Sequence, residues 1–267
     1  MHESPFRPDF LQGQVALVTG GGTGIGKACA LALAAHGAAV VLASRNEEKL
    51  AAVAAEIHAR GGEALALPCD IKDPGQVESM AEAAWAWRGG VDLLLNNAGA
   101  NFLAPALAIS ANGWRAVVDV VLNGTFYVSR AIGSRMVDRG RGRIVMMAAT
   151  NGENGSPLMA HSGAAKAGVI NLAQTLAVEW AASGVTVNAV CPGPVATEGA
   201  NQRLWADPAT MERIGKRVPL GRFATPDDCV GPVLFLASEA ASFVTGASLV
   251  VDGGDRLRNP AALFEAL

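Results

Sequence analysis

Tyrosine is almost absent from this sequence. The chain of 267 residues has eight phenylalanines and five tryptophans but a single tyrosine, Tyr127. That residue stands in an apolar string, Phe126-Tyr127-Val128, and we expect it to pack in the core rather than to react. Catalysis by a tyrosine phenol at any other position is therefore excluded.

The lack of paired cysteines, of long apolar runs and of a large net charge disfavours several classes of protein. The four cysteines are widely spaced without a CxxC pair, which indicates reduced thiols in the cytoplasm rather than a disulfide framework or a metal site. No apolar run approaches the ~20 residues of a membrane helix, and the N-terminus has no apolar signal core. The net charge of −3 argues against nucleic acid or an anionic membrane as the partner.

Short apolar runs alternate with helical patterns along almost the whole chain. Strands are expected close to 15–20, 38–44, 63–70, 91–99, 143–149, 185–190 and 248–254. Helices are expected over about 24–36, 46–62, after Pro74, 111–139 and 161–182. This alternation predicts an α/β fold: one doubly wound Rossmann-type domain over 1–267, with a parallel sheet of about seven strands and helices on both faces. Its core spans about 12–254, and the long irregular stretch 191–222 predicts a substrate lid.

A glycine-rich stretch, TGGGTGIG at 19–26, joins the first predicted strand to the first helix. Glycines let the backbone approach a pyrophosphate, and the start of the helix offers free N–H groups. A tight corner would use glycines too, but ligands of such sheets bind at the carboxyl ends of the strands, which favours a nucleotide site. The candidate contacts are Gly20, Thr23, Gly24, Ile25 and Gly26.

Ser44 and Arg45 end the second predicted strand, about twenty residues after the glycines. Enzymes that use NAD place an acid near this point for the ribose 2′-hydroxyl, whereas an arginine suits the 2′-phosphate of NADP. Glu47 and Glu48 are close by, and a merely solvated Arg45 is an open alternative. The sequence therefore favours NADP(H).

Five features together resemble the short-chain dehydrogenase/reductase family: TGGGTGIG, NNAG at 96–99, Asn123, Lys166 and PGPVAT at 192–197. They come in the family's order over about 12–254. The resemblance implies a nicotinamide cofactor with Lys166 on its ribose, and a homotetramer formed through the long helices. The other cofactor contacts that it implies are Asp70, Ile71, Asn97, Ala98, Gly99, Pro192, Gly193, Val195 and Thr197.

The resemblance fails at one position, in HSGAAKAG at 161–168. Members of the family usually carry a tyrosine four residues before the lysine, and a serine about a dozen residues earlier. Here Ser162 occupies the tyrosine position, and Thr150 and Asn151 occupy the serine region. A serine hydroxyl is not a competent acid near neutral pH, whereas a phenol beside a lysine is, so ordinary ketone reduction is disfavoured.

Conjugate reduction needs a different kind of donor. Hydride adds to a carbon remote from a thioester carbonyl, and negative charge collects on the carbonyl oxygen as an enolate. That oxygen needs hydrogen-bond donors, each worth about 3–4 kcal/mol by analogy with oxyanion holes. The hydroxyl of Ser162, one turn from Lys166, and the amide of Asn123 are the predicted donors, and the final proton comes from water.

Further stretches resemble the 2,4-dienoyl-CoA and trans-2-enoyl-CoA reductases, namely NFLAP (101–105), VVLNGTF (120–126), LAVEW (176–180) and CPGPVATEGANQRL (191–204). In this comparison Asn151 stands where the mitochondrial type has a tyrosine, and the acid of the peroxisomal type falls near Val121 and does not carry over. Asp119, Glu153 and His161 are further candidates for a proton donor, although structural roles are preferred for Asp119 and His161.

Two groups of residues bear on the substrate. Segment 201–222 has five basic residues against two acidic ones, which suits the phosphates of coenzyme A and also suits a solvated helix face. They are Arg203, Arg213, Lys216, Arg217 and Arg222, with Asp207 and Glu212. The apolar candidates for an acyl pocket are Phe102, Leu103, Leu158, Met159, Leu204 and Trp205.

The sequence thus predicts an NADPH-dependent reductase of a conjugated carbon–carbon double bond in an unsaturated acyl-CoA, with Lys166, Asn123 and Ser162 as catalytic residues. Two alternatives stay open. One is a carbonyl or 3-oxoacyl reductase whose proton donor is water, His161 or Asn151. The other is a catalytically silent NADP-binding protein.

Overall fold

A single parallel sheet forms the centre of the computed structural model, which describes residues 6–204 and 207–257. Its strand order is β3-β2-β1-β4-β5-β6-β7, and every neighbouring pair is parallel. The strands are β1 (Val15–Thr19), β2 (Ala39–Ser44), β3 (Ala64–Pro68), β4 (Leu93–Asn96), β5 (Gly142–Met147), β6 (Val185–Pro192) and β7 (Ser248–Val251). The predicted doubly wound α/β fold is confirmed.

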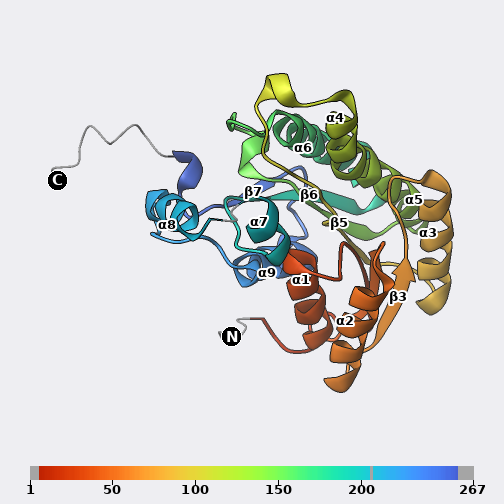
Figure 1. Ribbon diagram of the computed structural model, residues 1–267. Helices are drawn as coiled ribbons and strands as arrows, with labels where there is room; N and C mark the ends of the chain where they lie inside the picture. The colour runs from red at the N-terminus through yellow and green to blue at the C-terminus, as the bar shows by residue number, and fades with distance from the viewer. Residues whose placement is uncertain (1–5, 205–206, 258–267) are drawn as a thin grey trace.

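Helices cover both faces of this sheet (Figure 1). They are α1 (Gly24–Ala35), α2 (Glu47–Ala59), α3 (Pro74–Arg88), α4 (Ala111–Val118), α5 (Thr125–Arg139), α6 (Ala160–Trp180), α7 (Glu198–Arg203), α8 (Pro208–Arg217) and α9 (Val230–Ala237). Alternate residues of each strand face opposite sides, so the apolar strands feed two separate cores. One core packs against α3, α5 and α6, and the other against α1, α2 and α9.

The helix ends follow from local sequence chemistry. Asn46 and Asp73 accept hydrogen bonds from backbone N–H groups in the first turns of α2 and α3, which satisfies donors that the helix leaves free. Gly89 and Gly140 end α3 and α5 with positive φ, a conformation that costs glycine little. These caps place the ends of the helices within a few residues of their predicted positions.

Three features differ from the sequence predictions. The stretch 191–222, expected to be irregular, contains the helices α7 and α8. The helix α9 was not expected, because its short apolar sequence lacks helical periodicity. The predicted long helix 111–139 is interrupted by a π-helical segment, Asp119–Gly124, and segments of this kind are frequent at functional sites.

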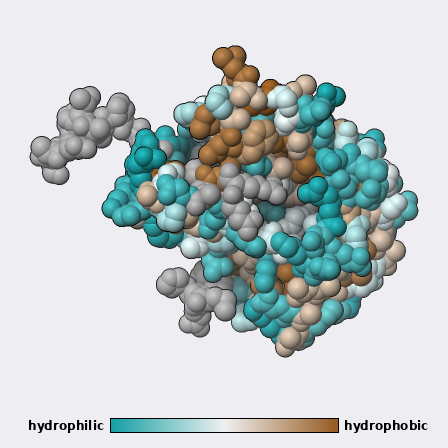
Figure 2. All heavy atoms as spheres, in the orientation of Figure 1, coloured by the Kyte–Doolittle hydropathy of each residue, from teal (hydrophilic) through white to brown (hydrophobic). Residues whose placement is uncertain are grey.

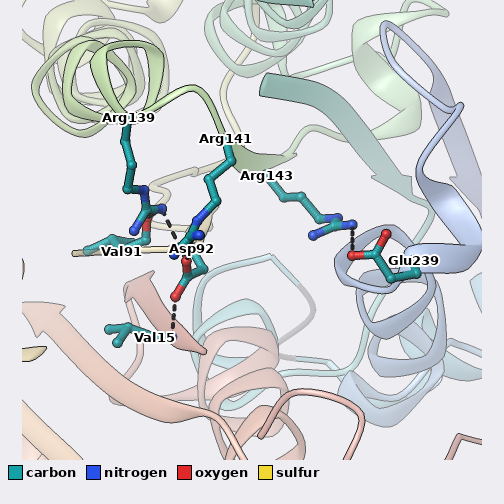
Figure 3. A network of polar contacts seen from close by, with 7 residues as sticks. All are labelled: Val15, Val91, Asp92, Arg139, Arg141, Arg143 and Glu239. Carbon is teal, nitrogen blue, oxygen red and sulfur yellow. Dashed lines mark hydrogen bonds and ion pairs between the residues drawn. The ribbon is translucent and has the colours of Figure 1, made fainter. Parts of the chain in front are cut away.

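Strand order reverses between β1 and β4, and the amino ends of these two strands are fastened by a polar network (Figure 3). The Asp92 carboxylate accepts from the backbone N–H of Val15 at 2.9 Å and pairs with Arg139 at 3.2 Å. Arg139 also donates to the carbonyl of Val91 at 2.6 Å. The network lies at the edge opposite to the carboxyl ends of the strands, where ligands of such sheets bind.

We expect Asp92→Ala to lower the free energy of unfolding by about 2–4 kcal/mol. The substitution removes the hydrogen-bond acceptor of the Val15 N–H. It also removes the counter-charge of the Arg139 guanidinium, whose side chain is only 20% exposed. Glu239→Ala is the matched control, because it breaks the ion pair to Arg143 from a side chain that is 84% exposed, and we expect a change below about 0.5 kcal/mol. Urea unfolding measures the free energy of unfolding of wild type and both variants. Equal losses would contradict a structural role for Asp92.

Candidate active site

A cavity of about 980 Å³ opens at the carboxyl ends of the central strands. Its floor is the glycine turn after β1, the NNAG segment after β4 and the start of the loop after β5. The segment 191–222 forms the other side of the cavity, with Thr210, Arg213, Ile214 and Arg217 of α8 in the lining. Asp255 is the one acid among the described residues that line the cavity.

The glycine turn is packed so closely that side chains are excluded. A Cβ on Gly26 would lie 2.3 Å from the Gly20 carbonyl oxygen and 2.4 Å from the Asn97 side-chain nitrogen. Gly20 and Gly24 have positive φ, which glycine adopts without strain. Of the five predicted contacts, Gly20, Thr23, Gly24 and Ile25 line the cavity, and Gly26 supports the turn from behind.

Asn97 has a structural task that the sequence did not reveal. Its side-chain amide donates to the carbonyl of Thr19 at 3.0 Å, and the Thr19 hydroxyl accepts from the backbone N–H groups of Asn97 and Ala98. These bonds tie the end of β4 to the glycine turn. Asn97, Ala98 and Gly99 all line the cavity, as predicted from the resemblance.

The opposite wall comes from the end of β6. Pro192, Gly193, Val195 and Thr197 all line the cavity. The Thr197 hydroxyl accepts from the N–H of Ala200 at 3.1 Å and so begins α7. Its methyl group would lie 3.3 Å from a Cβ built on Gly24, so the two walls approach each other at this point.

Lys166 reaches the cavity floor from α6. Its ammonium group donates to the carbonyl of Met147 at the end of β5 and lines the cavity. Burial removes the ammonium from water and lowers the pKa of Lys166 to about 8. The lysine therefore titrates close to neutral pH, and a small change in its surroundings alters its charge.

Ser162 and Asn151 form the polar pair beside this lysine. The Asn151 amide donates to the Ser162 hydroxyl oxygen at 3.3 Å, and both residues line the cavity. The close approach depends on Gly152, where a Cβ would lie 2.7 Å from the Lys166 backbone carbon. Because the serine oxygen accepts from Asn151 and donates to no acceptor in the described part of the protein, its proton is free to point at a ligand.

Asn151 is the residue whose importance the sequence understated. From the sequence, Asn151 stands where the mitochondrial type of reductase has a tyrosine and is an alternative proton donor. The signal that was available is an amide fifteen residues before Lys166, in a loop that Gly152 holds against α6.

Asn123 lies outside the cavity lining, unlike the other two predicted catalytic residues. It belongs to the π-helical segment, and its side-chain amide donates to the Asp119 carboxylate at 2.9 Å. The amide is thus engaged by an acid one turn earlier. Asp119 does not line the cavity either.

The remaining proton-donor candidates also lie outside the lining. Glu153 forms an ion pair with Arg256, which ties the loop after β5 to the C-terminal segment. His161 is fully buried, and its Nδ1 accepts from the N–H of Ser162 at 2.8 Å. Burial lowers the pKa of His161, with the Met159 carbonyl acting in the opposite direction, so the ring is neutral at pH 7. Tyr127 packs against the core and is absent from the lining.

Four predicted cofactor contacts lie beyond the cavity rim, after β2 and β3. Arg45 is exposed, with no hydrogen bond or ion pair to a described residue, and Ser44 precedes it at the end of β2. Asp70 accepts from the N–H of Lys72, and Ile71 is buried beneath Gly124 of the π-helical segment. A glycine cradle without room for side chains, with an unpaired arginine at the next strand end, fits a dinucleotide with a 2′-phosphate.

The predicted acyl-pocket residues divide into two groups. Leu103, Leu158, Met159 and Leu204 line the cavity. Phe102 instead packs edge-on against His161, with ring centroids 4.2 Å apart, and Trp205 lies outside the described residues, as does the side chain of Arg203. Leu158 has a φ of +66°, an unusual conformation for a leucine, and its carbonyl accepts from the N–H of Ala104 at 3.0 Å.

The described residues contain neither a metal-binding cluster nor a membrane-spanning helix. No group of three or more His, Cys, Asp or Glu side chains within 6–204 and 207–257 is placed to hold a metal ion. Over the same residues, every helix is too short or too polar for a membrane span.

Comparison with known proteins identifies the family to which the chain is similar. The family model described as enoyl-(acyl carrier protein) reductase matches residues 20–255. A peroxisomal 2,4-dienoyl-CoA reductase ((3E)-enoyl-CoA-producing) from Danio rerio is 39% identical over 250 residues, covering 93% of this chain and 83% of that protein. A 3-oxoacyl-[acyl-carrier-protein] reductase from Synechocystis sp. is 41% identical over 246 residues, covering 91% and 97%.

Solved structures give the same result. A gluconate 5-dehydrogenase from Burkholderia cenocepacia J2315, in complex with NADP and tartrate, matches with a TM-score of 0.89 and 36% identity, covering 93% of this chain and 97% of that one. The family model spans most of the chain, and these relatives are well above 30% identical over almost their full length. The chain therefore belongs to the short-chain dehydrogenase/reductase family of oxidoreductases.

Proposed function

We propose that this protein reduces a conjugated carbon–carbon double bond in an unsaturated acyl-CoA thioester, at the expense of NADPH. The observation that carries the proposal is the pair formed by Ser162 and Asn151 beside Lys166. This pair offers hydrogen bonds in a place where related oxidoreductases offer an acid. The likeness to the Danio rerio dienoyl-CoA reductase supports it.

The chain offers a fitting site for NADP(H). The glycine turn at Gly20 and Gly24 would hold the pyrophosphate, Arg45 the 2′-phosphate, and Pro192 to Thr197 the nicotinamide amide. When bound, NADPH supplies the hydride. Lys166 would hold the nicotinamide ribose, because its ammonium lies on the cavity floor between the ends of β5 and β6.

The role of the protein is to stabilise a charge that develops on the thioester oxygen. The Ser162 hydroxyl donates one hydrogen bond, and Asn151 orients that hydroxyl by donating to its oxygen. The nearby Lys166 ammonium adds a positive field in a partly desolvated site, where it acts more strongly than in water. Asn123 stays a proposed contributor only if its amide leaves Asp119 when substrate binds.

Protonation at carbon completes the reduction. Asp119, Glu153 and His161 lie outside the cavity lining, whereas Asp255 lines it. We assign this proton to water, which a cavity of about 980 Å³ can admit. A ketone reduced in the same site would leave an alkoxide that needs an acid at once, and serine does not supply one near neutral pH. The geometry thus favours an enolate over an alkoxide.

The second candidate is a carbonyl or 3-oxoacyl reductase, which the likeness to the Synechocystis enzyme favours. The two functions separate in one experiment. NADPH oxidation is followed at 340 nm in separate reactions with a 2,4-dienoyl-CoA, a trans-2-enoyl-CoA, a 3-oxoacyl-CoA and 5-ketogluconate. We expect turnover of the conjugated thioesters. Turnover of the ketones alone would overturn the proposal, and NADPH binding without any turnover would indicate a silent protein.

We expect Ser162→Ala to lower kcat for the conjugated thioester about 100-fold, because one oxyanion donor is lost. Ser162→Thr keeps a hydroxyl and is the matched control, with a much smaller loss. Asn151→Ala is expected to cost less than Ser162→Ala, and the double variant to cost little more than Ser162→Ala, since Asn151 acts through the serine. Additive losses in this cycle would contradict the coupling.

Lys166 gives the activity a pH dependence. Since burial lowers the pKa of Lys166 to about 8, the ammonium is lost as pH rises through 8, and kcat/KM should fall there with an apparent pKa near that value. The Lys166→Met variant should have a strongly reduced activity, and its kcat/KM should no longer fall as pH rises through 8. The variant should remain folded at pH 7, because the depressed pKa means that the charged lysine destabilises the fold below pH 8. An unchanged alkaline limb in the variant would assign it to another group.

We further propose a homotetramer in the cytoplasm. Apolar surface gathers over α4 and α6 in Figure 2, and Leu107, Trp114, Phe126 and Val178 are exposed on or beside α4, α5 and α6. The four cysteines are buried free thiols with no disulfide between them, as is usual for proteins of a reducing compartment. Multi-angle light scattering should give four times the mass of the chain, and a monomer at micromolar concentration would contradict the assembly.

A further inference from the structure

We propose that Arg213 and Arg217 form an anion subsite on the lid, which binds the phosphate groups of the coenzyme A portion of the substrate. This inference rests on the proposed function, and it selects two residues from the five basic ones of segment 201–222. Two observations carry it: which basic residues are already paired with acids, and which line the cavity.

The other cations of the segment that the structure describes have acidic partners. Lys216 pairs with Glu212 at 2.6 Å on the solvent side of α8. Arg222 makes a two-pronged contact with Asp228, at 2.7 and 2.8 Å, which also lowers the pKa of that carboxyl. These two cations are neutralised locally and do not line the cavity.

Arg213 and Arg217 are different on both counts. Neither forms an ion pair with a described residue. The Arg213 guanidinium lies 3.5 Å from the Thr210 hydroxyl, and its charge acts on the Asp207 carboxylate only from beyond ion-pair distance. They stand four residues apart on α8, and so lie on one face of that helix, which Ile214 and Thr210 share. All four of these residues line the cavity.

A simpler explanation is that the arginines stabilise α8, since cations near the end of a helix interact well with its dipole. That effect accounts for charge in the last turn, where Lys216 and Arg217 both stand. The helix dipole does not account for Arg213, because that residue is in the middle of the helix. Nor does it explain why the two arginines that line the cavity are the two that form no ion pair with a described residue.

The position of α8 argues that the anion belongs to the substrate rather than to the cofactor. Figure 1 shows α8 on the side of β7, whereas β2, which ends at Ser44 before the proposed 2′-phosphate contact Arg45, lies on the opposite side of the sheet. Apolar Leu158, Met159 and Ile214 line the same cavity. An acyl thioester has this distribution of chemistry: an apolar chain, a reactive carbonyl and phosphates at a distance.

Both arginines are exposed in this structure, so each contact with a phosphate is expected to contribute modestly. We expect Arg213→Gln or Arg217→Gln to raise KM for a dienoyl-CoA about fivefold, and the double variant about twentyfold, with kcat little changed. The effect should shrink as salt concentration rises, because exposed charges are screened.

The test compares three thioesters of one dienoyl chain: the coenzyme A ester, the 3′-dephospho-coenzyme A ester and the N-acetylcysteamine ester, which has no phosphate. For wild type we expect KM to increase along this series. In the double variant the three KM values should converge. Lys216→Gln is the matched control, because it removes one positive charge from the same helix without touching the lining, and it should retain the wild-type order.

The outcomes separate the two proposals. Turnover of all three esters with equal KM in wild type and double variant would overturn the subsite and leave the proposed function intact. No turnover of any thioester would overturn the proposed function. In that case calorimetric titration of the NADP-loaded protein with coenzyme A and with gluconate decides the subsite. Binding of coenzyme A that the double variant loses supports it, whereas loss of gluconate binding alone overturns it in favour of a small carboxylate.

Discussion

The site depends on one contact, the Lys166 ammonium donating to the carbonyl of Met147. It joins the middle of α6 to the end of β5, and burial of the charge lowers the pKa of the lysine to about 8. One turn earlier on the same helix, Ser162 is thereby held at the cavity wall. Gly152 lets the loop after β5 lie against this turn, which brings Asn151 to the serine oxygen.

The chemistry follows from what this arrangement donates. The oriented Ser162 hydroxyl stabilises a negative oxygen but does not readily protonate it, and the Lys166 ammonium is engaged by the carbonyl of Met147. With the single tyrosine packed in the core, the described lining offers no phenol. An enolate tolerates this, because its proton is finally delivered to carbon. Under the proposed function, a change at one turn of one helix adapts a fold that usually exchanges alcohols and ketones to conjugated thioesters.

Much of the fold and of the cofactor site could be predicted from the sequence. Buried strands alternating with helices determine a doubly wound sheet, and the glycines of 19–26 mark the turn where no side chain fits. Contacts between distant segments could not be predicted, because they depend on packing: examples are Asn97 bonding to Thr19 and Glu153 paired with Arg256. The lid was expected to be irregular because its helices are short, and the partition of its charges became visible only once α8 was placed over the cavity.

The central claim concerns which atom of the substrate receives the hydride. The most direct measurement uses NADPH deuterated at the transferable position with a 2,4-dienoyl-CoA, followed by NMR and mass spectrometry of the product. The account predicts deuterium on a carbon of the former conjugated system, with the thioester carbonyl intact. No transfer of deuterium to the dienoyl chain, together with transfer to the carbinol carbon in a parallel reaction with a 3-oxoacyl-CoA, would contradict it.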